Sequence, residues 1–478
     1  MGNKPVKSKT RGKYLITTAI DYTNDVIHLG HAYQKILADV LARYHRLNDD
    51  EVFFLTGTDE HGQNIERSAA KNNKTPKEWC DEISKKDREQ LDALNISYDR
   101  FIRTTDTDHE ETSINFYRRV LENGDIYESG YNGFYCESCE AYKTLSELIG
   151  GRCEFHPTLE PKRIVEKNYF FRWSKYRDFL REYINTNRGF IVPETRKNEM
   201  LAFLEGGLED IPITRQNISW GFPAPNDPRQ TIYVWFDALI NYYTAGRRVG
   251  FWDEKTEITH VLGKDNTRWH TLLWPAMLKS ANLRLPNTVI NHSFLTLEGR
   301  KISKTLGNII RPTELTQKYG SDAVRYYLIR FGPLFDDADI SIKRLEEVYN
   351  SDLANNIGNL VSRVAKLCET SGFNFEKETR SLKFHKSISE VFKNYRVDLA
   401  LQNYFETKIK ESNEYIDKNK PWKLEGEKLN KVLTKLVAEI REIAFNIEPF
   451  IPQSALKIKE QFKGPKINSE KPLFPRLS

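Results

Sequence analysis

The sequence predicts an α/β protein in which a split, Rossmann-like parallel sheet is followed by an α-helical bundle. Short apolar runs alternate with amphipathic segments in residues 14–115, and the same alternation returns in residues 231–295. Residues 116–230 interrupt it with a segment that contains cysteines and many aromatic side chains, and beyond about residue 340 the pattern is helical. Alternating strands and helices build parallel sheets, so the two halves are predicted to form one sheet around an insertion.

The strand candidates are short runs of apolar and β-branched residues bounded by turn-forming residues, which is typical of buried strands. They are residues 14–20, 52–55, 232–235, 258–262 and 288–290. Between the first two runs, apolar residues recur at spacings of three and four, which predicts an amphipathic helix that includes Ile36, Val40 and Tyr44. Open parallel sheets bind ligands beyond the carboxyl ends of their strands, so a site is expected in the loops that follow these runs.

These patterns divide the chain into segments with different predicted roles. They are a basic N-terminal tail (1–13), the first half of the Rossmann-like domain (14–115), a connective insertion (116–230) with a metal knuckle at about 133–158, the second half (231–295), a loop and linker (296–340), and a helical domain (341–478). We find no internal repeat and no long low-complexity stretch, which excludes a repeat architecture.

The composition is that of a soluble globular protein, with 39% hydrophobic and 29% charged residues over 478 positions. No run approaches the ~20 apolar residues that span a bilayer, and no apolar segment follows the basic start. Neither a membrane span nor a secretory signal is therefore predicted, and a cytoplasmic location is expected. The net charge of +5 permits an RNA partner without requiring one.

The motif His28-Leu29-Gly30-His31 lies between a predicted strand and a predicted helix. A helix N-terminus presents unpaired N–H groups to phosphate, and Gly30 lets a nucleotide approach the backbone because it has no Cβ. Both imidazoles can donate hydrogen bonds to phosphate oxygens as charge builds in a transition state. Taken alone, the motif is equally compatible with an ordinary turn.

A second motif, Lys301-Ile302-Ser303-Lys304-Thr305, follows a glycine-containing turn. Two lysines with hydroxyl groups between them can clamp a leaving polyphosphate. A lysine- and serine-rich loop is by itself usually only a solvated surface. The order of the two motifs, on opposite sides of a split α/β domain, favours a shared role in binding ATP.

The cysteines and one histidine form a third pattern. Cys136-x-x-Cys139 and Cys153-x-x-His156 are separated by thirteen residues, a spacing typical of zinc knuckles. Four protein ligands leave no open position on a tetrahedral ion, so one structural Zn2+ is predicted. The alternative is three buried cysteines and an unrelated surface histidine. Clustered thiols without a metal, however, would be reactive and would not hold the segment in a defined structure.

The two ATP motifs resemble the His-Ile-Gly-His and Lys-Met-Ser-Lys-Ser signatures of class I aminoacyl-tRNA synthetases, with Leu29, Ile302 and Thr305 as mild departures. Other blocks resemble the methionyl-tRNA synthetase family in particular, in that family's order and over essentially the whole chain. They are residues 54–62, 233–239, 269–270, 273–278 and 419–422.

The resemblance implies a ligase that joins L-methionine to tRNA(Met) for translation initiation and elongation. It would use ATP with Mg2+ to make methionyl-adenylate and pyrophosphate, and would then transfer methionine to the terminal adenosine of the tRNA. His28 and His31 are expected to act on the transition-state phosphates, and Lys301 and Lys304 on the pyrophosphate side. The implied ATP-binding residues are His28, Gly30, His31, Arg215, Asp265, Lys301, Ser303 and Lys304.

For methionine, the resemblance implies that Asp59 holds the ammonium group and that a set of mainly apolar and aromatic residues forms the side-chain pocket. The pocket residues are Ile20, Tyr22, Trp235, Ala238, Leu239, Tyr242 and His270. A thioether packs well against aromatic faces, which agrees with such a pocket, although aromatic residues after a strand more often belong to a core. The family commonly has Pro-Ile-Tyr-Tyr where this chain has Ala19-Ile20-Asp21-Tyr22, and this departure puts the Asp21 carboxylate beside the expected binding face.

In the helical domain, Asn359 and Arg363 are four residues apart and are predicted to share one helix face. The resemblance implies that these two residues and Trp422 read the anticodon, since amide, guanidinium and aromatic groups suit single-stranded RNA. The alternative is that Asn359 caps a helix and Trp422 is part of the core. No dimerising segment is visible after the helical part, so a monomer is expected.

Three other functions fit the sequence less well. A synthetase for isoleucine, valine or leucine carries a large editing domain, for which residues 116–230 leave too little room, and a cysteine enzyme would place zinc in its amino-acid pocket. A non-catalytic tRNA-binding relative has no need of the histidines and lysines of the ATP motifs. A small-molecule nucleotidyltransferase has no use for a helical domain or for Trp422.

Overall fold

The computed structural model describes residues 11–154, 157–302, 307–379 and 381–477. Residue contacts divide the chain into two compact units. The sheet unit comprises the chain up to Ile27, His45–Glu89 and Ser97–His292; the helical unit comprises His28–Tyr44, Gln90–Ile96 and the chain from Ser293.

The sheet unit is built on a seven-stranded sheet in which every strand pair is parallel. In order across the sheet, the strands are β10 (Ile191–Val192), β16 (Thr288–His292), β15 (Thr256–Gly263), β1 (Lys13–Thr18), β3 (Glu51–Asp59) and β2 (Asp21–Tyr22), with β4 (Arg100–Arg103) also beside β3. This arrangement confirms the predicted Rossmann-like sheet.

The central strands are apolar because the sheet is covered on both faces. Leu15 and Ile16 of β1 and Ile258 of β15 are almost completely buried, as expected for parallel strands flanked by helices. Gly57 of β3 lies so close to β4 that a Cβ would be 1.9 Å from the carbonyl oxygen of Ile102. No side chain fits at that position without moving the strand.

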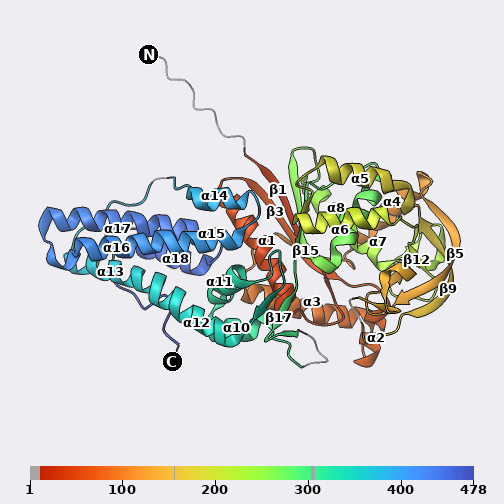
Figure 1. The fold of residues 1–478 in the computed structure, drawn as a ribbon, viewed down its shortest axis with the longest axis horizontal. Coiled ribbons are helices and arrows are strands. Elements are labelled where there is room, and N and C mark those ends of the chain that lie inside the picture. The colour runs from red at the N-terminus through yellow and green to blue at the C-terminus, as the bar shows by residue number, and fades with distance from the viewer. Residues whose placement is uncertain (1–10, 155–156, 303–306, 380, 478) are drawn as a thin grey trace, which may run out of the picture. The chain divides into compact units, whose positions relative to one another are not determined.

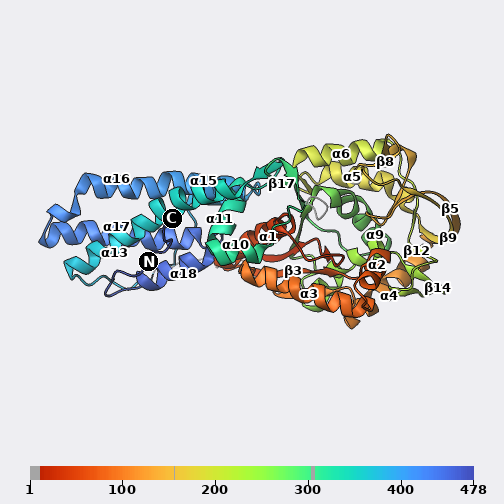
Figure 2. The same cartoon turned by 90° about the horizontal axis from the view of Figure 1, so that it is seen from below.

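The helices of the sheet unit connect and cover these strands. They are α2 (Gln63–Lys71), α3 (Pro76–Ala93), α4 (Thr107–Glu122), α5 (Arg177–Thr186), α6 (Glu194–Glu205), α7 (Val234–Leu239), α8 (Asn241–Arg248), a π turn (Trp269–Leu273) and α9 (Trp274–Ser280). Helices α5 and α6 lie side by side (Figure 2). Shorter 3₁₀ turns occur at Leu145–Glu147, Trp173–Tyr176 and Lys264–Asn266.

The prediction of a strand at residues 232–235 is wrong. Strand β14 (Asp227–Ile232) ends where that run begins, and α7 starts at Val234. Strand β14 belongs to a small antiparallel sheet with β12 (Thr214–Arg215) and β13 (Pro223–Ala224), not to the parallel sheet. A short apolar run is compatible with a buried helix as well as a buried strand, and here the burial of α7 explains the pattern.

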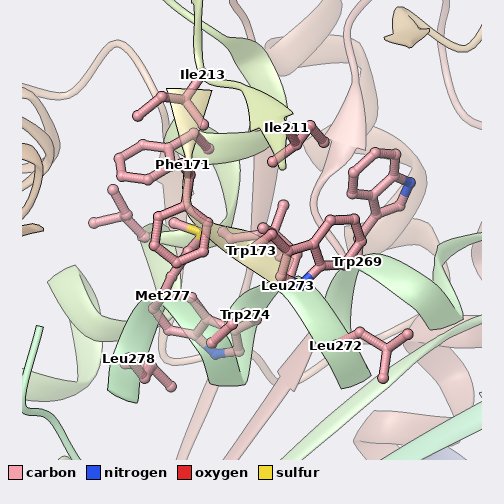
Figure 3. Packing of buried hydrophobic residues seen from close by; sticks show 14 of the residues in the cluster. Phe171, Trp173, Ile211, Ile213, Trp269, Leu272, Leu273, Trp274, Met277 and Leu278 are labelled. Atoms are coloured by element: carbon pink, nitrogen blue, oxygen red, sulfur yellow. The ribbon is translucent and has the colours of Figure 1, made fainter. Parts of the chain in front are cut away.

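The insertion is dominated by two long antiparallel strands, β5 (Ile126–Cys136) and β9 (Lys162–Phe171). With β6 (Ala141–Lys143) and β11 (Ile211–Pro212) they form a four-stranded sheet, and β7 (Leu148–Ile149) pairs with β8 (Arg152–Cys153). Figure 3 shows Phe171, Ile211 and Ile213 of the insertion packed against residues of the π turn and α9. The insertion therefore shares a hydrophobic core with the sheet instead of forming a separate body.

The helical unit contains most of α1 (Leu29–Leu47) and the chain from Ser293 onward. Its strands are β17 (Leu295–Leu297), β18 (Arg300–Lys301) and β19 (Ala338–Ile340). Its helices are α10 (Pro312–Tyr319), α11 (Ser321–Phe331), α12 (Ile342–Val348), α13 (Asn359–Ser371), α14 (Lys386–Phe392), α15 (Val397–Tyr404), α16 (Lys410–Asn419), α17 (Gly426–Ile447) and α18 (Pro452–Gln461). Further turns are the π segments Tyr349–Gly358 and Phe405–Ile409 and a 3₁₀ turn at Pro421–Lys423.

Helices α13, α16 and α17 run side by side in this unit, which confirms the predicted helical region (Figure 1). The helices begin at Pro312, earlier than residue 340. Helix α1 is attached to them by the fully buried Arg325, whose Nη1 lies 2.7 Å from the carboxylate of Asp39. Arg325 also donates hydrogen bonds to the carbonyl oxygens of Pro449 and Phe450, each at 2.9 Å. Across the described parts of the chain, no helix has the length and hydropathy to cross a membrane.

Candidate active site and metal centre

Four of the residues predicted to bind methionine lie at or beyond the carboxyl ends of neighbouring parallel strands, and the other four lie in α7 and α8. Ile20 and Tyr22 follow β1, Asp59 is the last residue of β3, and the π turn that contains His270 follows β15. Tyr22 and Asp59 are register partners in the β2–β3 pair. This edge of an open parallel sheet is where such folds bind ligands.

Asp59 is a buried carboxylate that lacks a full set of partners. Its Oδ1 atom is buried and has no hydrogen-bond partner among the described residues. Burial, followed by the nearby charges of Asp237 and Glu140, raises the pKa of Asp59 well above its usual value. A buried anion is costly unless it is paired, so this position favours a cationic group such as an ammonium.

Tyr242 and His270 form a neutral pair. The Nδ1 atom of His270 lies 3.0 Å from the carbonyl oxygen of Asn266, so it carries the ring proton and leaves Nε2 as an acceptor. The hydroxyl of Tyr242 donates to that Nε2 at 2.7 Å. Burial lowers the pKa of His270 to about 4, which keeps the ring uncharged near neutral pH. A pair without net charge suits an apolar substrate side chain.

Aromatic stacking completes the predicted pocket wall. The rings of Trp235 and Trp269 are stacked, with centroids 4.6 Å apart and planes 13° apart. Ala238 and Leu239 are buried, and Ile20, Tyr22 and Trp235 are partly buried against the same hydrophobic core as Leu239 and Tyr242. Most of the predicted pocket residues therefore pack in or against one hydrophobic core of the sheet unit, and Trp269 belongs to the same core.

The first ATP motif lies at the start of α1, in the helical unit. The N–H of Gly30 donates to Nδ1 of His28 at 3.0 Å, and the N–H of His28 donates to Nδ1 of His31 at 3.3 Å. The two rings have centroids 4.2 Å apart. Because each Nδ1 accepts a hydrogen bond, the proton of each neutral imidazole is on Nε2. Both rings are thus set up as donors, which is the state needed to bind phosphate oxygens.

The second motif is only partly described. Lys301 is exposed at the end of β18, where its carbonyl oxygen accepts a hydrogen bond from Asn308 Nδ2 at 3.0 Å. Ser303, Lys304 and Thr305 lie outside the described residues.

Asp265 and Arg215 belong to the sheet unit and differ in exposure. Asp265 is exposed in the turn that follows β15. Arg215 is 4% exposed, and its Nε and Nη2 donate to the two carboxylate oxygens of Glu166 at 3.0 and 3.2 Å. Its guanidinium also lies 4.3 Å from the ring centroid of Tyr135. These contacts favour a structural role for Arg215 in the insertion, and its role in ATP binding stays a prediction.

The insertion brings the three knuckle cysteines together. The thiol sulfurs of Cys136, Cys139 and Cys153 all lie within 4.8 Å of one another, and those of Cys139 and Cys153 are 3.5 Å apart. Tetrahedral zinc with Zn–S bonds of about 2.3 Å requires sulfurs about 3.8 Å apart, so this donor set fits such an ion. His156, the fourth predicted ligand, lies outside the described residues.

Comparison with known proteins identifies the family. The model for class I tRNA synthetases (M) matches residues 14–159 and 145–365. A methionine–tRNA ligase of Nostoc sp. is 40% identical over 490 residues, which cover 95% of this chain and 90% of the relative. A methionine–tRNA ligase of Thermotoga maritima is 41% identical, with 93% of this chain and 74% of the relative covered.

The chain belongs to the methionyl-tRNA synthetase family. A solved structure of the Mycobacterium tuberculosis methionyl-tRNA synthetase in complex with methionyl-adenylate agrees, with a TM-score of 0.87 and 34% sequence identity. That match covers 97% of this chain and 100% of the solved chain. The family and the fold predicted from the motifs are therefore confirmed, whereas the roles of individual residues stay predictions.

The residues predicted for the anticodon lie close together in the helical unit of this synthetase-family chain. The guanidinium of Arg363 is 5.2 Å from the ring centroid of Trp422 and also donates to Asp417 at 2.9 Å. Trp422 is 52% exposed, which argues against the alternative that it is a core residue. Asn359 is exposed at the start of α13.

Sequence reasoning missed a buried cluster next to Asp59. The carboxylate of Asp237 contacts His61 Nδ1 at 2.8 Å, His109 Nε2 at 3.1 Å and Ser113 Oγ at 2.8 Å. Burial opposes the charge of Asp237, but His109 and His61 outweigh it and hold its pKa well below the usual value. These residues come from three distant segments, so no local motif could have indicated the cluster.

Proposed function

We propose that the protein is a methionine–tRNA ligase, which activates L-methionine with ATP and transfers it to the terminal adenosine of tRNA(Met) for translation initiation and elongation. The main support is the combination of a buried, incompletely paired Asp59 carboxylate with an uncharged aromatic wall at the carboxyl edge of the sheet. An ammonium group fits the carboxylate, and an apolar, polarizable thioether fits the aromatic rings.

Activation is an in-line displacement at the α-phosphorus of ATP. The substrate carboxylate forms the new O–P bond, the bond to pyrophosphate breaks, and the adenylate remains. This step needs positioning and charge neutralisation more than covalent help from the protein. His28 and His31 donate from Nε2 to phosphate oxygens, and Lys301 and Lys304 neutralise the pyrophosphate. Gly30, Ser303, Arg215 and Asp265 complete the proposed ATP-binding set, with Mg2+ as the companion of ATP.

The metal proposed for the cysteine cluster is a single structural Zn2+ bound by Cys136, Cys139, Cys153 and His156. A closed set of sulfur and imidazole ligands holds the knuckle and leaves no position for a substrate. We expect one zinc per chain by elemental analysis, and a lower melting temperature after chelation. A metal-free preparation that is fully folded and active would contradict this assignment.

Asn359, Arg363 and Trp422 are proposed to bind the anticodon of tRNA(Met), because Trp422 offers an exposed plane for stacking and the other two offer donors for base edges. We further propose a cytoplasmic monomer, with the domain boundaries given by the sequence patterns. The relatives named as methionine–tRNA ligases support the assignment of the activity.

The decisive experiment is amino-acid-dependent ATP–pyrophosphate exchange, with each of the twenty amino acids tested separately. Exchange with methionine alone would support the activity, the pocket and the ATP motifs together. Exchange with another amino acid would keep the ATP motifs and overturn the pocket. Absence of exchange with all of them, in a folded and metal-loaded sample, would favour a non-catalytic tRNA-binding protein.

A further inference from the structure

The loop that joins β5 to β6, residues 137–140, contains a buried carboxylate. Glu140 directly follows Cys139, is 3% exposed, and has a left-handed backbone with φ of 45°. A buried carboxylate and a left-handed backbone at a non-glycine residue are both unfavourable by themselves. Such a residue persists where its contacts hold it in place, and an observed outlier of this kind points to a role.

The contacts of Glu140 lead to the predicted methionine pocket. Its Oε1 atom accepts a hydrogen bond from the hydroxyl of Tyr22 at 2.8 Å and a short one from the backbone N–H of Asn64 in the first turn of α2. Its backbone carbonyl oxygen accepts from the hydroxyl of Tyr233 at 2.5 Å. The preceding carbonyl, that of Cys139, accepts from the indole Nε1 of Trp235 at 3.3 Å. The same loop therefore accepts hydrogen bonds from both Tyr22 and Trp235, two residues predicted to line the pocket.

The fit around this carboxylate is tight. A Cβ on Gly62 would be 2.3 Å from Oε2 of Glu140 and 2.8 Å from the hydroxyl of Tyr22. Only a residue without a side chain leaves room for the phenol and the carboxylate to meet there. Gly62 has φ of 111°, a conformation that glycine adopts readily and other residues do not.

We propose that Glu140 is a positioning residue for the amino-acid substrate. It fixes the phenol of Tyr22 and the start of α2, so that the pocket wall is already formed before methionine arrives. It acts through Tyr22 and does not touch the substrate. This inference rests on the proposed methionine-activating function and adds a residue that neither ATP motif nor metal ligand set includes.

A preformed wall lowers the ordering cost of binding, so its loss weakens methionine binding more than the chemical step. Substitution of a residue that merely supports the fold would change the KM for methionine and the KM for ATP by similar factors. The pattern of loss between the two substrates therefore separates a positioning role from a structural one.

The test uses the full-length, metal-loaded protein with Glu140→Ala, Glu140→Gln and Tyr22→Phe. The matched control is Glu137→Ala, since Glu137 lies in the same loop but pairs its carboxylate with Arg67 at 2.5 Å and Lys162 at 3.0 Å. Methionine binding is measured by tryptophan fluorescence without ATP. Pyrophosphate exchange then gives KM for methionine and for ATP, and elemental analysis gives the metal content.

We expect Glu140→Ala to raise the methionine Kd about ten-fold, as loss of a hydrogen bond to a charged group would, with the ATP KM and the metal content unchanged. Glu140→Gln keeps an acceptor for Tyr22 and should recover most of the affinity. Tyr22→Phe should reproduce the loss, and combining it with Glu140→Ala should add little. Glu137→Ala should leave the methionine Kd within about two-fold, because its surface ion pairs are worth little.

The proposal is overturned if Glu140→Ala leaves the methionine Kd unchanged. It is also overturned if this variant raises the KM for methionine and the KM for ATP by similar factors. It is also overturned if Glu140→Ala and Tyr22→Phe have independent, additive effects. If Glu140→Ala fails to fold, Glu140→Gln and Tyr22→Phe decide the matter through the same split between methionine and ATP. Wild-type protein that binds no methionine would instead contradict the proposed function.

Discussion

Tyr242, His270 and the Oδ1 atom of Asp59 are buried in the sheet unit, whereas Lys301 and Asp265 are exposed at the end of a strand and in a turn. The first group is predicted to select methionine and the second to bind ATP. Selection by an apolar pocket depends on fixed walls, because small differences in side-chain shape carry little energy. Phosphoryl transfer depends on charges that can reach the phosphates. For these residues, burial accompanies the predicted selection of methionine, and exposure accompanies the predicted delivery of charge; Arg215, buried but predicted for ATP, departs from this pattern.

The largest effect is expected for Asp59→Asn. We expect kcat/KM for methionine to fall about 10³-fold, since truncating one partner of a buried charge pair costs about 2–5 kcal/mol. The ATP KM should change little. Because the free carboxylate is buried with an unpaired oxygen, the same change should raise the melting temperature of the ligand-free protein. A parallel fall in methionine activation and in melting temperature would show that Asp59 supports the fold instead.

On the ATP side, Lys304→Ala should lower the rate of pyrophosphate exchange about 10²-fold, the effect of removing one preorganised charge donor. The methionine Kd should stay within about two-fold, because Lys304 is predicted to act on the pyrophosphate and not on methionine. Lys304→Arg is the control that keeps the charge. An exchange rate that is nearly unchanged in Lys304→Ala would refute the assignment of the second motif.

A pH titration sharpens the claim that the methionine wall is uncharged. The folded-state pKa of His270 is about 4, below the ordinary value near 6.5, so the unfolded chain takes up a proton in this window that the folded chain does not. Stability is therefore complete above pH 6.5 and falls as the pH drops toward 4, by about 2 kcal/mol between pH 7 and 5. Urea unfolding at both pH values checks this, and His270→Gln should remove that part of the slope. An identical slope in the variant would mean that His270 has the same pKa in the folded and unfolded chains.

The smallest effect is expected in the helical unit. Trp422→Ala should raise KM for tRNA about ten-fold, in line with about 1–3 kcal/mol for stacking one base on an aromatic ring. The KM for methionine should not change, and Trp422→Phe should keep most of the tRNA affinity because it keeps an aromatic face. Aminoacylation kinetics with tRNA as the varied substrate provide the measurement. Equal effects on tRNA and methionine would argue that Trp422 has a packing role.

Much of the sheet could be predicted because its buried strands are apolar and its ligand loops are polar. The run at residues 52–55 lies in the first half of β3 (Glu51–Asp59), and the run at 258–262 lies within β15 (Thr256–Gly263). Strands β2 and β10 have two residues each, too short for any period to appear. Their existence depends on neighbouring strands and not on their own sequence.

The candidate site divides in the same way. Motifs close together in sequence, such as the start of α1 and the cysteine pairs, could be found by spacing. The links of Asp237 to His61 and His109, and of Glu140 to Tyr22, join residues separated by more than one hundred positions. Pairing at that distance is set by the tertiary fold, and a single sequence contains no signal for it.

Because Trp269–Leu273 forms a π turn, the shape of the predicted pocket depends on the number of residues in this segment. A π turn accommodates one residue more than the α turn it replaces. Here it lets two consecutive large side chains serve one wall, with Trp269 stacked on Trp235 and His270 bonded to Tyr242. In a relative that lacks one residue here, the segment would form an ordinary α-helix, and the ring that corresponds to His270 would point in another direction. This would hold even if all aligned residues were identical. A one-residue alignment gap in this helix is therefore a stronger sign of an altered amino-acid pocket than most substitutions around it.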